Sequence, residues 1–553
     1  MAFECQKSAG IYTDSRVIGK NYCEKQTAGS SSFNLEAESE GIESDKSEII
    51  TSLTSKHLLS KNAPVGGRSI TDLPPAIISE ILNCLDPKEL GIVSCVSTVL
   101  HSIASEHHVW KEFYSERWGL PVPAQSAPVV PNGLSDERSW KDLFVEREFR
   151  SKTFMGRYTM EVLHGHTEAV RTVFVLASAK LIFTSGYDSI VRIWELEEGL
   201  SIASSRSLGC TIRALAADTK LLVAGGTDGF IHCWKAVEGL SYLFDVKGPL
   251  NHNIEFRLWE HEGPITSLAL DLTRIYSGSW DMTVRVWDRF SHRCLNILRH
   301  GDWVWGLVPH DTTVASTSGS DVYVWDTNSG ELATVIHEAH VGYAYALARS
   351  HTGDFLFTGG EDGAIHMFDI TNRHVDTSAQ LVGSWIPHSG PVYSLAFEFP
   401  WLVSASSDGK LSLIDVRPLL RTKKRTLWKR DSRGQHVQSI SVEPPQRMLH
   451  GFGSNLFGVD IGMDRIVCGG EEGVVRIWNF TQALEAERRA RALRGIRLEN
   501  RMRRRRLQIE MNTKSGGARS DQCSFAAKKT PMNGGDRVSV WHNKRGVSGK
   551  LKA

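Results

Sequence analysis

The feature that most constrains this fold is a short segment that recurs through the middle and C-terminal parts of the chain. Its first copy is Leu-Ile-Phe-Thr-Ser-Gly-Tyr-Asp-Ser-Ile-Val-Arg-Ile-Trp-Glu at residues 181–195. A seventh copy ends at Trp325 after a shortened turn. β-Branched residues alternate before the end of each copy with the period of a β-strand. In six copies an acidic residue stands six positions before an aromatic or apolar one, and the pairs are Asp188/Trp194, Asp228/Trp234, Asp281/Trp287, Asp362/Phe368, Asp408/Ile414 and Glu472/Trp478.

The spacing of the copies predicts a mainly β fold. Successive end positions lie 40, 53, 38, 43, 46 and 64 residues apart. A period of about 40–45 residues with strand patterning is typical of a propeller of four-stranded blades. We therefore expect a seven-bladed β-propeller over residues 153–480. Residues 154–160 read as a strand, which we expect to complete the sheet of blade seven because closure removes two open sheet edges.

Histidines recur before the acidic turn residues and refine this interpretation. They precede them by 20–22 positions in six copies, at His166, His261, His300, His340, His388 and His450. The pattern resembles WD-repeat propellers, in which His, Ser or Thr, Asp and Trp form a hydrogen-bonded network inside each blade. Because buried imidazole and indole N–H groups need partners, this role is structural and neither catalytic nor metal-binding. The resemblance assigns the network to His166, Thr184, Asp188 and Trp194 in blade one, and to His261, Ser277, Asp281 and Trp287 in blade three.

Some blades depart from this pattern. Blade two carries Cys210 and Ala224 at the His and Ser/Thr positions. Blades five and six carry Phe368 and Ile414 in place of Trp, and blade seven carries Glu472 in place of Asp. We expect these blades to depend more on apolar packing.

A small apolar helical module is predicted at residues 68–118. Thr71 or Asp72 can cap a helix whose first turn tolerates the prolines that follow. Apolar residues then recur at intervals of three to four, first from Ile77 to Leu85 and again after the Asp86-Pro87 break. Three short helices form only a marginal core, which a partner covering its apolar faces would stabilise.

The order and spacing of these residues resemble an F-box. The resemblance implies docking on a Skp-type adaptor of a cullin-based ubiquitin ligase. Departures are Ala76, where the family commonly has an acidic residue, and Ser97–Val99, where a Cys-Lys-x-Trp/Phe-like segment is usual. Adaptor contacts are expected from Leu73, Pro74, Ile77, Ile81, Leu82, Leu85, Leu90, Val93 and Trp110.

The remaining segments are a leader, a linker and a tail. Residues 1–67 are acidic, contain serines and are poor in apolar residues, so we expect disorder. Residues 119–152 are expected to be a linker, proline-rich at first and then helical from Asp136 to Phe149. The tail at residues 481–553 has a net charge of +13, from 19 Lys and Arg against six acidic residues. We expect a helix over 482–511 and disorder beyond it.

The tail contains four consecutive arginines, Arg503, Arg504, Arg505 and Arg506. Such a run is a candidate for nuclear import, for contact with RNA or DNA, or for an acidic partner, and it can also be a solvated tail.

A candidate surface for a protein substrate follows from the propeller resemblance. In such propellers, ligands often bind at the mouth of the central channel. Three positions in each repeat tend to face this mouth: the third and fifth residues after the histidine, and the residue before the acidic turn residue. Aromatic residues and arginines dominate the energetics of protein interfaces. Arg171 and Arg213 could pair with a phosphate or a carboxylate, which leaves a phosphorylated substrate open. The positions are Arg171, Tyr187, Arg213, Trp280, Trp303, Trp305, Tyr343, Tyr393, Glu361 and Glu471.

Composition limits the function classes. No run approaches eighteen apolar residues, so we expect no membrane span. The nine cysteines show no C-x-x-C spacing, which predicts a reduced intracellular chain without disulfides or a zinc site. No nucleophile signature, phosphate-binding loop or cofactor motif is present, so we expect a non-catalytic protein.

Two functions agree with these features. The first is a substrate-recognition subunit of an SCF-type ubiquitin ligase, in which the F-box docks the adaptor on its cullin scaffold and the propeller holds a protein substrate that the sequence does not identify. The alternative is a nuclear scaffold or RNA-associated propeller whose basic tail contacts nucleic acid. The expected location is the nucleus, the cytoplasm or both.

Overall fold

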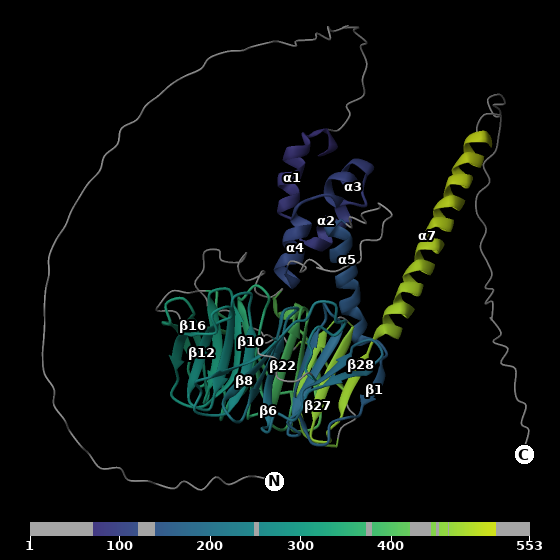
Figure 1. Ribbon diagram of the computed structural model, residues 1–553. Helices are drawn as coiled ribbons and strands as arrows, with labels where there is room; N and C mark the ends of the chain where they lie inside the picture. Colours follow the sequence, from purple (N-terminus) through teal and green to yellow (C-terminus); the bar gives the residue numbers. More distant parts are fainter. Residues whose placement is uncertain are drawn as a thin grey trace, which may run out of the picture. The chain divides into compact units, whose positions relative to one another are not determined.

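The computed structural model contains a seven-bladed propeller and a helical module (Figure 1). The predicted leader, the proline-rich part of the linker, the last part of the tail and His450 lie outside the described residues. Among the helices of the described residues, none is long and apolar enough to cross a membrane. The described residues are 70–119, 139–247, 254–371, 379–420, 444–449, 453–462 and 464–515.

Seven antiparallel four-stranded sheets confirm the predicted number of blades. Blade one is β2 Val170–Leu176, β3 Leu181–Gly186, β4 Arg192–Glu195 and β5 Ser201–Ser204. Blade two is β6 Ile212–Ala217, β7 Leu221–Gly226, β8 Phe230–Lys235 and β9 Glu255–Trp259. Blade three is β10 Ile265–Leu270, β11 Arg274–Ser279, β12 Thr283–Asp288 and β13 Cys294–Arg299. Blade four is β14 Val304–His310, β15 Thr313–Ser318, β16 Asp321–Asp326 and β17 Leu332–Ile336.

The last three blades follow the same order. Blade five is β18 Ala344–Arg349, β19 Phe355–Gly360, β20 Ile365–Asp369 and β21 Gln380–Trp385. Blade six is β22 Val392–Glu398, β23 Trp401–Ser406, β24 Leu411–Asp415 and β25 Gln446–Leu449. Blade seven is β26 Leu456–Gly462, β27 Arg465–Gly470, β28 Val475–Asn479 and β1 Thr159–Leu163.

The propeller closes through strand β1, which pairs antiparallel with β28 from Thr159↔Asn479 to Leu163↔Val475. The predicted strand at 154–160 was therefore wrong in its bounds although closure is present. Phe154 lies in the 3-10 helix η2, Lys152–Met155, instead. Its ring packs 4.9 Å from that of Phe480, so it fills the core at the point where the chain ends meet.

The core lies between neighbouring blades, because the second strand of each blade is almost entirely buried. All seven second strands end in Gly or Ser, and these small residues let the sheets approach each other closely. A Cβ added to Gly469 of β27 would lie 2.5 Å from Val170 Cγ1 of β2. Blades seven and one therefore need glycine at this position in order to pack.

One irregularity recurs in all seven blades. The first strand of each blade shifts its register between its first and third residues, so the second residue is bulged. A bulge leaves one residue outside the pairing ladder and redirects its side chain. The bulged residues are Arg171, Arg213, Thr266, Trp305, Tyr345, Tyr393 and Phe457.

The helical module begins with the 3-10 helix η1, Ile70–Asp72, and continues through four helices to a fifth in the linker. Asp86 and Glu89 form a capping box at the start of α2, and Ser97 caps α3 through Leu100 N. The expected helix from 136 to 149 is described from Trp140 onward, where Ser139 caps it. The helices are α1 Pro75–Asn83, α2 Pro87–Val93, α3 Thr98–Ser105, α4 Val109–Trp118 and α5 Trp140–Ser151.

Helices α4 and α5 contact blade six. Trp118 Nε1 donates to the Phe399 carbonyl at 2.7 Å, and the Phe399 ring packs against the core of the helical module. Arg147 of α5 is ion-paired with Glu398 at 2.9 Å. Trp401 Nε1 donates to the Ser151 carbonyl at 2.5 Å. The linker helix is thus bound to the turn between β22 and β23 by indole, guanidinium and apolar contacts together.

The chain leaves blade seven as one helix, α7, Thr481–Ser515. It is anchored at its start, where Leu484 is buried and Arg488 is ion-paired with Glu146 of α5 at 2.5 Å. Beyond the first turns its side chains are exposed. The helix continues through Gly495. It is therefore longer than the predicted range of 482–511.

Candidate docking surfaces

The predicted side-chain network is present in blade one. His166 Nδ1 lies 2.6 Å from Asp188 Oδ2, and His166 Nε2 lies 2.7 Å from Thr184 Oγ1. Trp194 Nε1 donates to the same hydroxyl at 2.8 Å. The four side chains connect four segments of the blade to one another: the segment that enters the blade, the second strand, the turn and the third strand.

Blade three repeats the arrangement. His261 lies 2.6 Å from Asp281 and 2.7 Å from Ser277, and Trp287 Nε1 donates to Ser277 at 2.9 Å. Burial opposes ionisation of Asp281, but hydrogen bonds from His261 and Thr283 outweigh it and lower the pKa of Asp281 to about 2. These histidines are therefore occupied in holding the blade together.

Blades four, seven and two differ from this arrangement, each in its own way. In blade four, burial lowers the pKa of His300 to about 4, and the neutral ring accepts a hydrogen bond from Trp325 Nε1 at 3.2 Å. In blade seven, Glu472 is ion-paired with Arg476. Blade two has lost the hydroxyl at Ala224, and the indole N–H of Trp234 has no hydrogen-bond partner.

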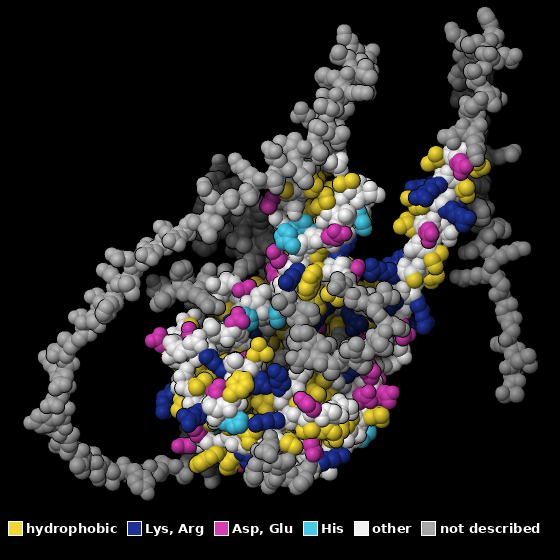
Figure 2. All heavy atoms as spheres, turned by 45° about the horizontal axis from the view of Figure 1, so that its top comes forward, with side chains coloured by type: hydrophobic (Ala, Val, Ile, Leu, Met, Phe, Trp, Pro, Cys, Tyr) yellow, Lys and Arg dark blue, Asp and Glu magenta, His cyan; other side chains and the backbone are white. Residues whose placement is uncertain are grey.

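The helical module presents an apolar face on one side of α1. Leu73, Ile77 and Ile81 are 39%, 48% and 41% exposed, and Pro74 is exposed beside them. Their neighbours Ile78 and Leu82 point inward and are buried. Exposed apolar groups at helical spacing form a surface that a partner can cover. Figure 2 shows hydrophobic side chains on the surface of this module.

Three of the expected adaptor contacts are wrong for this conformation. Leu82, Leu90 and Trp110 are at most 3% exposed because they form the core of the module together with Phe144 of the linker helix. Leu85 and Val93 are half-buried against the same core. Apolar residues at helical spacing predict a face that is covered by other residues. The spacing does not distinguish residues of the same chain from those of a partner.

Four further apolar residues of the module are exposed and were not singled out from the sequence as expected adaptor contacts. They are Ile70, Ile92, Val96 and Val99, with exposed fractions of 49% to 68%. Their spacing held a signal, because 70, 73, 77 and 81 lie three or four residues apart, as do 92, 96 and 99. We call the surface formed by Ile70, Leu73, Pro74, Ile77, Ile81, Ile92, Val96 and Val99 the apolar helical face.

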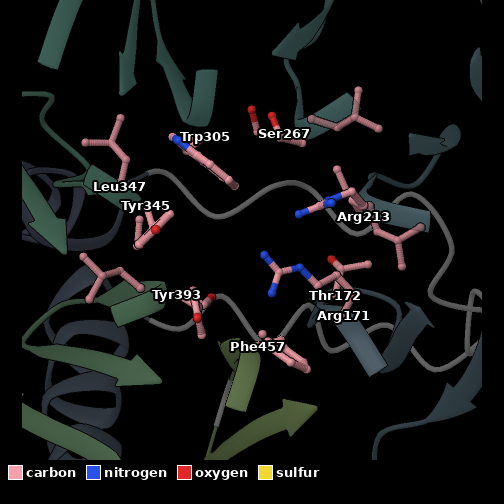
Figure 3. A pocket seen from close by; sticks show the side chains of 18 of the residues that line it. Arg171, Thr172, Arg213, Ser267, Trp305, Tyr345, Leu347, Tyr393 and Phe457 are labelled. Carbon is pink, nitrogen blue, oxygen red and sulfur yellow. The ribbon is translucent and has the colours of Figure 1, made fainter. Parts of the chain in front are cut away.

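The second candidate surface is a cavity of about 180 Å³ in the channel of the propeller, lined by all seven bulged residues. We call these residues the channel ring. Four of its members are aromatic and two are arginines on neighbouring blades. Figure 3 shows the side chains of Arg171 and Arg213 extending toward the same space as those of Trp305, Tyr345 and Tyr393.

The aromatic side chains of the ring contact one another around the channel. Ring centroids are 4.9 Å apart for Trp305 and Tyr345, 5.4 Å for Tyr345 and Tyr393, and 5.7 Å for Tyr393 and Phe457. Arg171 closes this arc, since its guanidinium lies 4.8 Å from the Phe457 ring. The arc forms a continuous wall beside the two cations.

The two arginines are poised for an anion. Neither guanidinium is ion-paired with a carboxylate among the described residues. Burial lowers the pKa of Arg171, while burial and then the charge of Arg171 lower the pKa of Arg213 to about 10. A pKa of about 10 leaves Arg213 cationic at neutral pH, and a guanidinium group is not deprotonated in proteins. An anion between them would relieve their mutual repulsion and replace lost hydration.

The other predicted substrate residues form a more exposed layer. Trp280 and Trp303 stack at 4.9 Å, and Arg213 lies 4.5 Å from the Trp280 ring. Tyr343 packs 5.9 Å from Trp305, whereas Tyr187 lies in the β3–β4 turn and is 43% exposed. Glu361 and Glu471 accept hydrogen bonds from Tyr343 N and Asn455 Nδ2, each at 3.1 Å.

Three ring members were missed from the sequence. Tyr345 and Thr266 stand five residues after His340 and His261, which is the offset of Arg171 from His166, so a signal for them existed. Phe457 lacks this offset because the segment before blade seven is longer. The four arginines Arg503–Arg506 are exposed on α7 (Figure 2).

The chain thus combines a small helical docking module with a propeller of WD-repeat architecture, and comparisons with known proteins agree with this class. The F-box-like family model matches residues 70–116. The model of the WD domain, G-beta repeat, matches residues 157–195, 253–288, 331–369 and 379–415. An F-box/WD-40 repeat-containing protein of Arabidopsis thaliana is 66% identical over 485 residues, which cover 88% of each chain. The chain belongs to the F-box/WD-40 repeat-containing proteins.

More distant relatives share part of the chain. A probable E3 ubiquitin ligase complex SCF subunit, sconB, of Arthroderma benhamiae is 28% identical over 160 residues, 24% of each chain. Pre-mRNA-processing factor 19 of Bos taurus is 29% identical over 144 residues, 25% of this chain and 27% of that one. The solved WD40 propeller domain of Doa1 matches with a TM-score of 0.45 and 19% identity, over 58% of this chain and 97% of that one.

Proposed function

We propose that this protein is a substrate-recognition subunit of an SCF-type ubiquitin ligase, which docks a Skp-type adaptor of the cullin scaffold through the apolar helical face. The observation that carries this proposal is the exposure of Ile77 and Ile81 on α1, and of Leu73 just before it, while Ile78 and Leu82 on the other side of the helix are buried. The resemblance to a probable SCF subunit supports it. Such a subunit needs no nucleophile of its own, because it acts by raising the effective concentration of a substrate lysine near the charged ubiquitin-conjugating enzyme.

The substrate would bind at the channel ring through an anionic group. Arg171 and Arg213 supply adjacent cations without carboxylate partners, and the aromatic arc supplies apolar contact area. The cavity of about 180 Å³ suits one side chain and excludes a folded element. A phosphorylated side chain or a carboxylate would therefore enter the ring, while the body of the substrate lies on the more exposed layer of Trp280, Trp303 and Tyr187.

The adaptor contact is tested by affinity purification of the full chain carrying Ile77→Asp and Ile81→Asp. Adaptor and cullin, identified by mass spectrometry, should accompany the wild-type chain and be lost from the variant. Leu272→Asp is the matched control, because Leu272 is an 89% exposed apolar residue of the propeller. Recovery of adaptor with the double variant, or its absence from the wild type, would overturn the proposal.

We also propose that the protein enters the nucleus through Arg503–Arg506. The support is a run of four exposed arginines on a helix that extends beyond its contacts with α5. Contact of the same helix with RNA or DNA is the competing function. The salt dependence of nucleic-acid binding distinguishes this function from nuclear import.

A further inference from the structure

Blade two contains a group of side chains that neither docking surface uses. Cys210 stands before β6, Asp228 lies in the turn between β7 and β8, and His232 lies on β8. Their ligand atoms, the Cys sulfur, a carboxylate oxygen and a ring nitrogen, all lie within 4.8 Å of one another. His232 Nε2 is 3.7 Å from Asp228 Oδ2, which is too long for a hydrogen bond.

The histidine is the unusual member of this group. His232 is fully buried, yet neither of its ring nitrogens has a hydrogen-bond partner. A buried polar group without a partner is destabilising, and native proteins rarely leave one without a structural or functional reason. The imidazole stacks on Trp234 at 6.3 Å, which orients the ring but satisfies neither nitrogen. A neutral imidazole carries one N–H donor and one nitrogen lone pair, so a metal ion that takes the lone pair would satisfy one of the two nitrogens of His232.

Comparison with blade one shows how this group arises. Blade one has His166 and Thr184 where blade two has Cys210 and Ala224, and both blades keep the turn aspartate and the tryptophan. Blade one has Arg192 where blade two has His232. Blade two has thus exchanged a hydrogen-bonded network for a thiol, a carboxylate and an imidazole converging from three segments of one sheet.

We propose that Cys210, Asp228 and His232 bind a divalent transition-metal ion, Zn²⁺ by the chemistry of the ligands, which fastens blade two in place of the missing network. Thiolate, imidazole and carboxylate are the side chains that bind zinc, at about 2.0–2.3 Å. Ligands around one tetrahedral ion then lie about 3.5 Å apart, close to the separation of His232 and Asp228. On binding, the sulfur coordinates as thiolate and its proton passes to solvent, and water occupies the fourth position on the partly exposed side of Asp228.

A second group, His340, Asp362 and His366 in blade five, is less suited to an ion. His340 already uses both ring nitrogens, with Asp362 at 3.1 Å and Thr358 at 2.8 Å. That blade retains its network, so a metal would have to break it. The blade-five group also lacks a thiol, which makes the two groups distinguishable by spectroscopy.

The test is a titration of the full chain with Co²⁺, a spectroscopic substitute for Zn²⁺, after removal of metal with a chelator. We expect one equivalent to produce the charge-transfer absorption of a thiolate–Co²⁺ bond, and Zn²⁺ to abolish it by displacement. Cys210→Ala should lose the absorption. Cys233→Ala is the matched control, because Cys233 is a buried thiol of β8 whose side chain lies on the opposite face of the strand from that of His232, and it should keep the absorption.

Two further variants keep the test decisive if Cys210→Ala does not fold. Asp228→Asn and His232→Gln should each weaken Co²⁺ binding at least tenfold, and added Zn²⁺ should raise the unfolding temperature of the wild type but not of Asp228→Asn. No thiolate–Co²⁺ absorption in the wild type would overturn the proposal. Absorption that persists in a folded Cys210→Ala variant, or is lost in Cys233→Ala, would overturn it as well.

Discussion

Tyr393 and Glu398 lie five residues apart on strand β22, near its opposite ends. Tyr393 is a member of the channel ring, whereas Glu398 is ion-paired with Arg147 of the linker helix. At about 3.4 Å per residue, roughly 17 Å of strand separates them. The helical module is therefore attached at the end of β22 away from the ring, and the proposed ligand in the ring would not compete with the proposed adaptor on α1.

Neighbouring residues of α1 should respond in opposite ways to substitution. Leu82→Ala should destabilise the helical module by about 2–5 kcal/mol, because Leu82 is only 3% exposed. Ile81→Ala should change its stability by less than about 0.5 kcal/mol, because its side chain is on the surface. Hydrogen exchange of α1 and α3 measures both effects. Equal protection in the two variants would contradict the assignment of the apolar helical face.

The paired arginines should bind anions. Inorganic phosphate should raise the unfolding temperature of the wild type more than that of Arg171→Gln or Arg213→Gln. The same measurement with acetate tests whether the site binds a carboxylate. Arg299→Gln, which removes a cation from the exposed side of β13, is the control. A response to phosphate alone would favour a phosphorylated substrate. An identical response in all four proteins would remove the anion site.

The network of blade three should make stability depend on pH. The pKa of Asp281 is lowered from 3.8 to about 2, so the ionised carboxylate contributes about 2 kcal/mol above pH 4. This contribution is lost as the pH falls through about 2. Asp281→Asn should therefore lower the urea midpoint at pH 7 and have little effect near pH 2. A deficit that stays constant over this range would exclude an ionised Asp281 as its source.

The basic helix separates the proposed location from the competing function. Replacing Arg503–Arg506 by Gln should abolish nuclear accumulation of the fluorescently tagged full chain. Replacing Arg491, Arg494, Arg497 and Arg501 removes the same charge and should leave import intact. If α7 instead contacts RNA, the first variant should reduce the slope of log affinity against log salt by about 3–4. Salt-independent or absent RNA binding would eliminate the nucleic-acid function.

The sequence alone predicted the architecture because each blade carries its own signal. The acidic turn residue and the residue six positions later mark the second and third strands locally, and Asp188 and Asp281 each contact the histidine that their spacing indicates. Strand β1 was harder to delimit, because no repeat marks it and its register is set by pairing with Asn479 at the other end of the propeller.

The sites were less predictable than the fold. Leu82, Leu90 and Trp110 belong to the core because the linker helix contributes Phe144 to the module, a contact between residues that periodicity cannot join. Phe457 enters the ring through a bulge, which depends on the pairing of β26 with β27. The isolation of His232 became visible only once its surroundings were known, since a histidine in a strand has no distinctive spacing.

The bulges of the first strands have an evolutionary consequence. A bulged residue has no partner in the pairing ladder, so the geometry of the sheet makes few demands on its side chain. In this propeller the bulged residue of every first strand contributes to one cavity. Single side chains of the ring can thus be exchanged while the pairing of the strands stays the same, so that the chemistry of the cavity can diverge between related propellers without a change of scaffold.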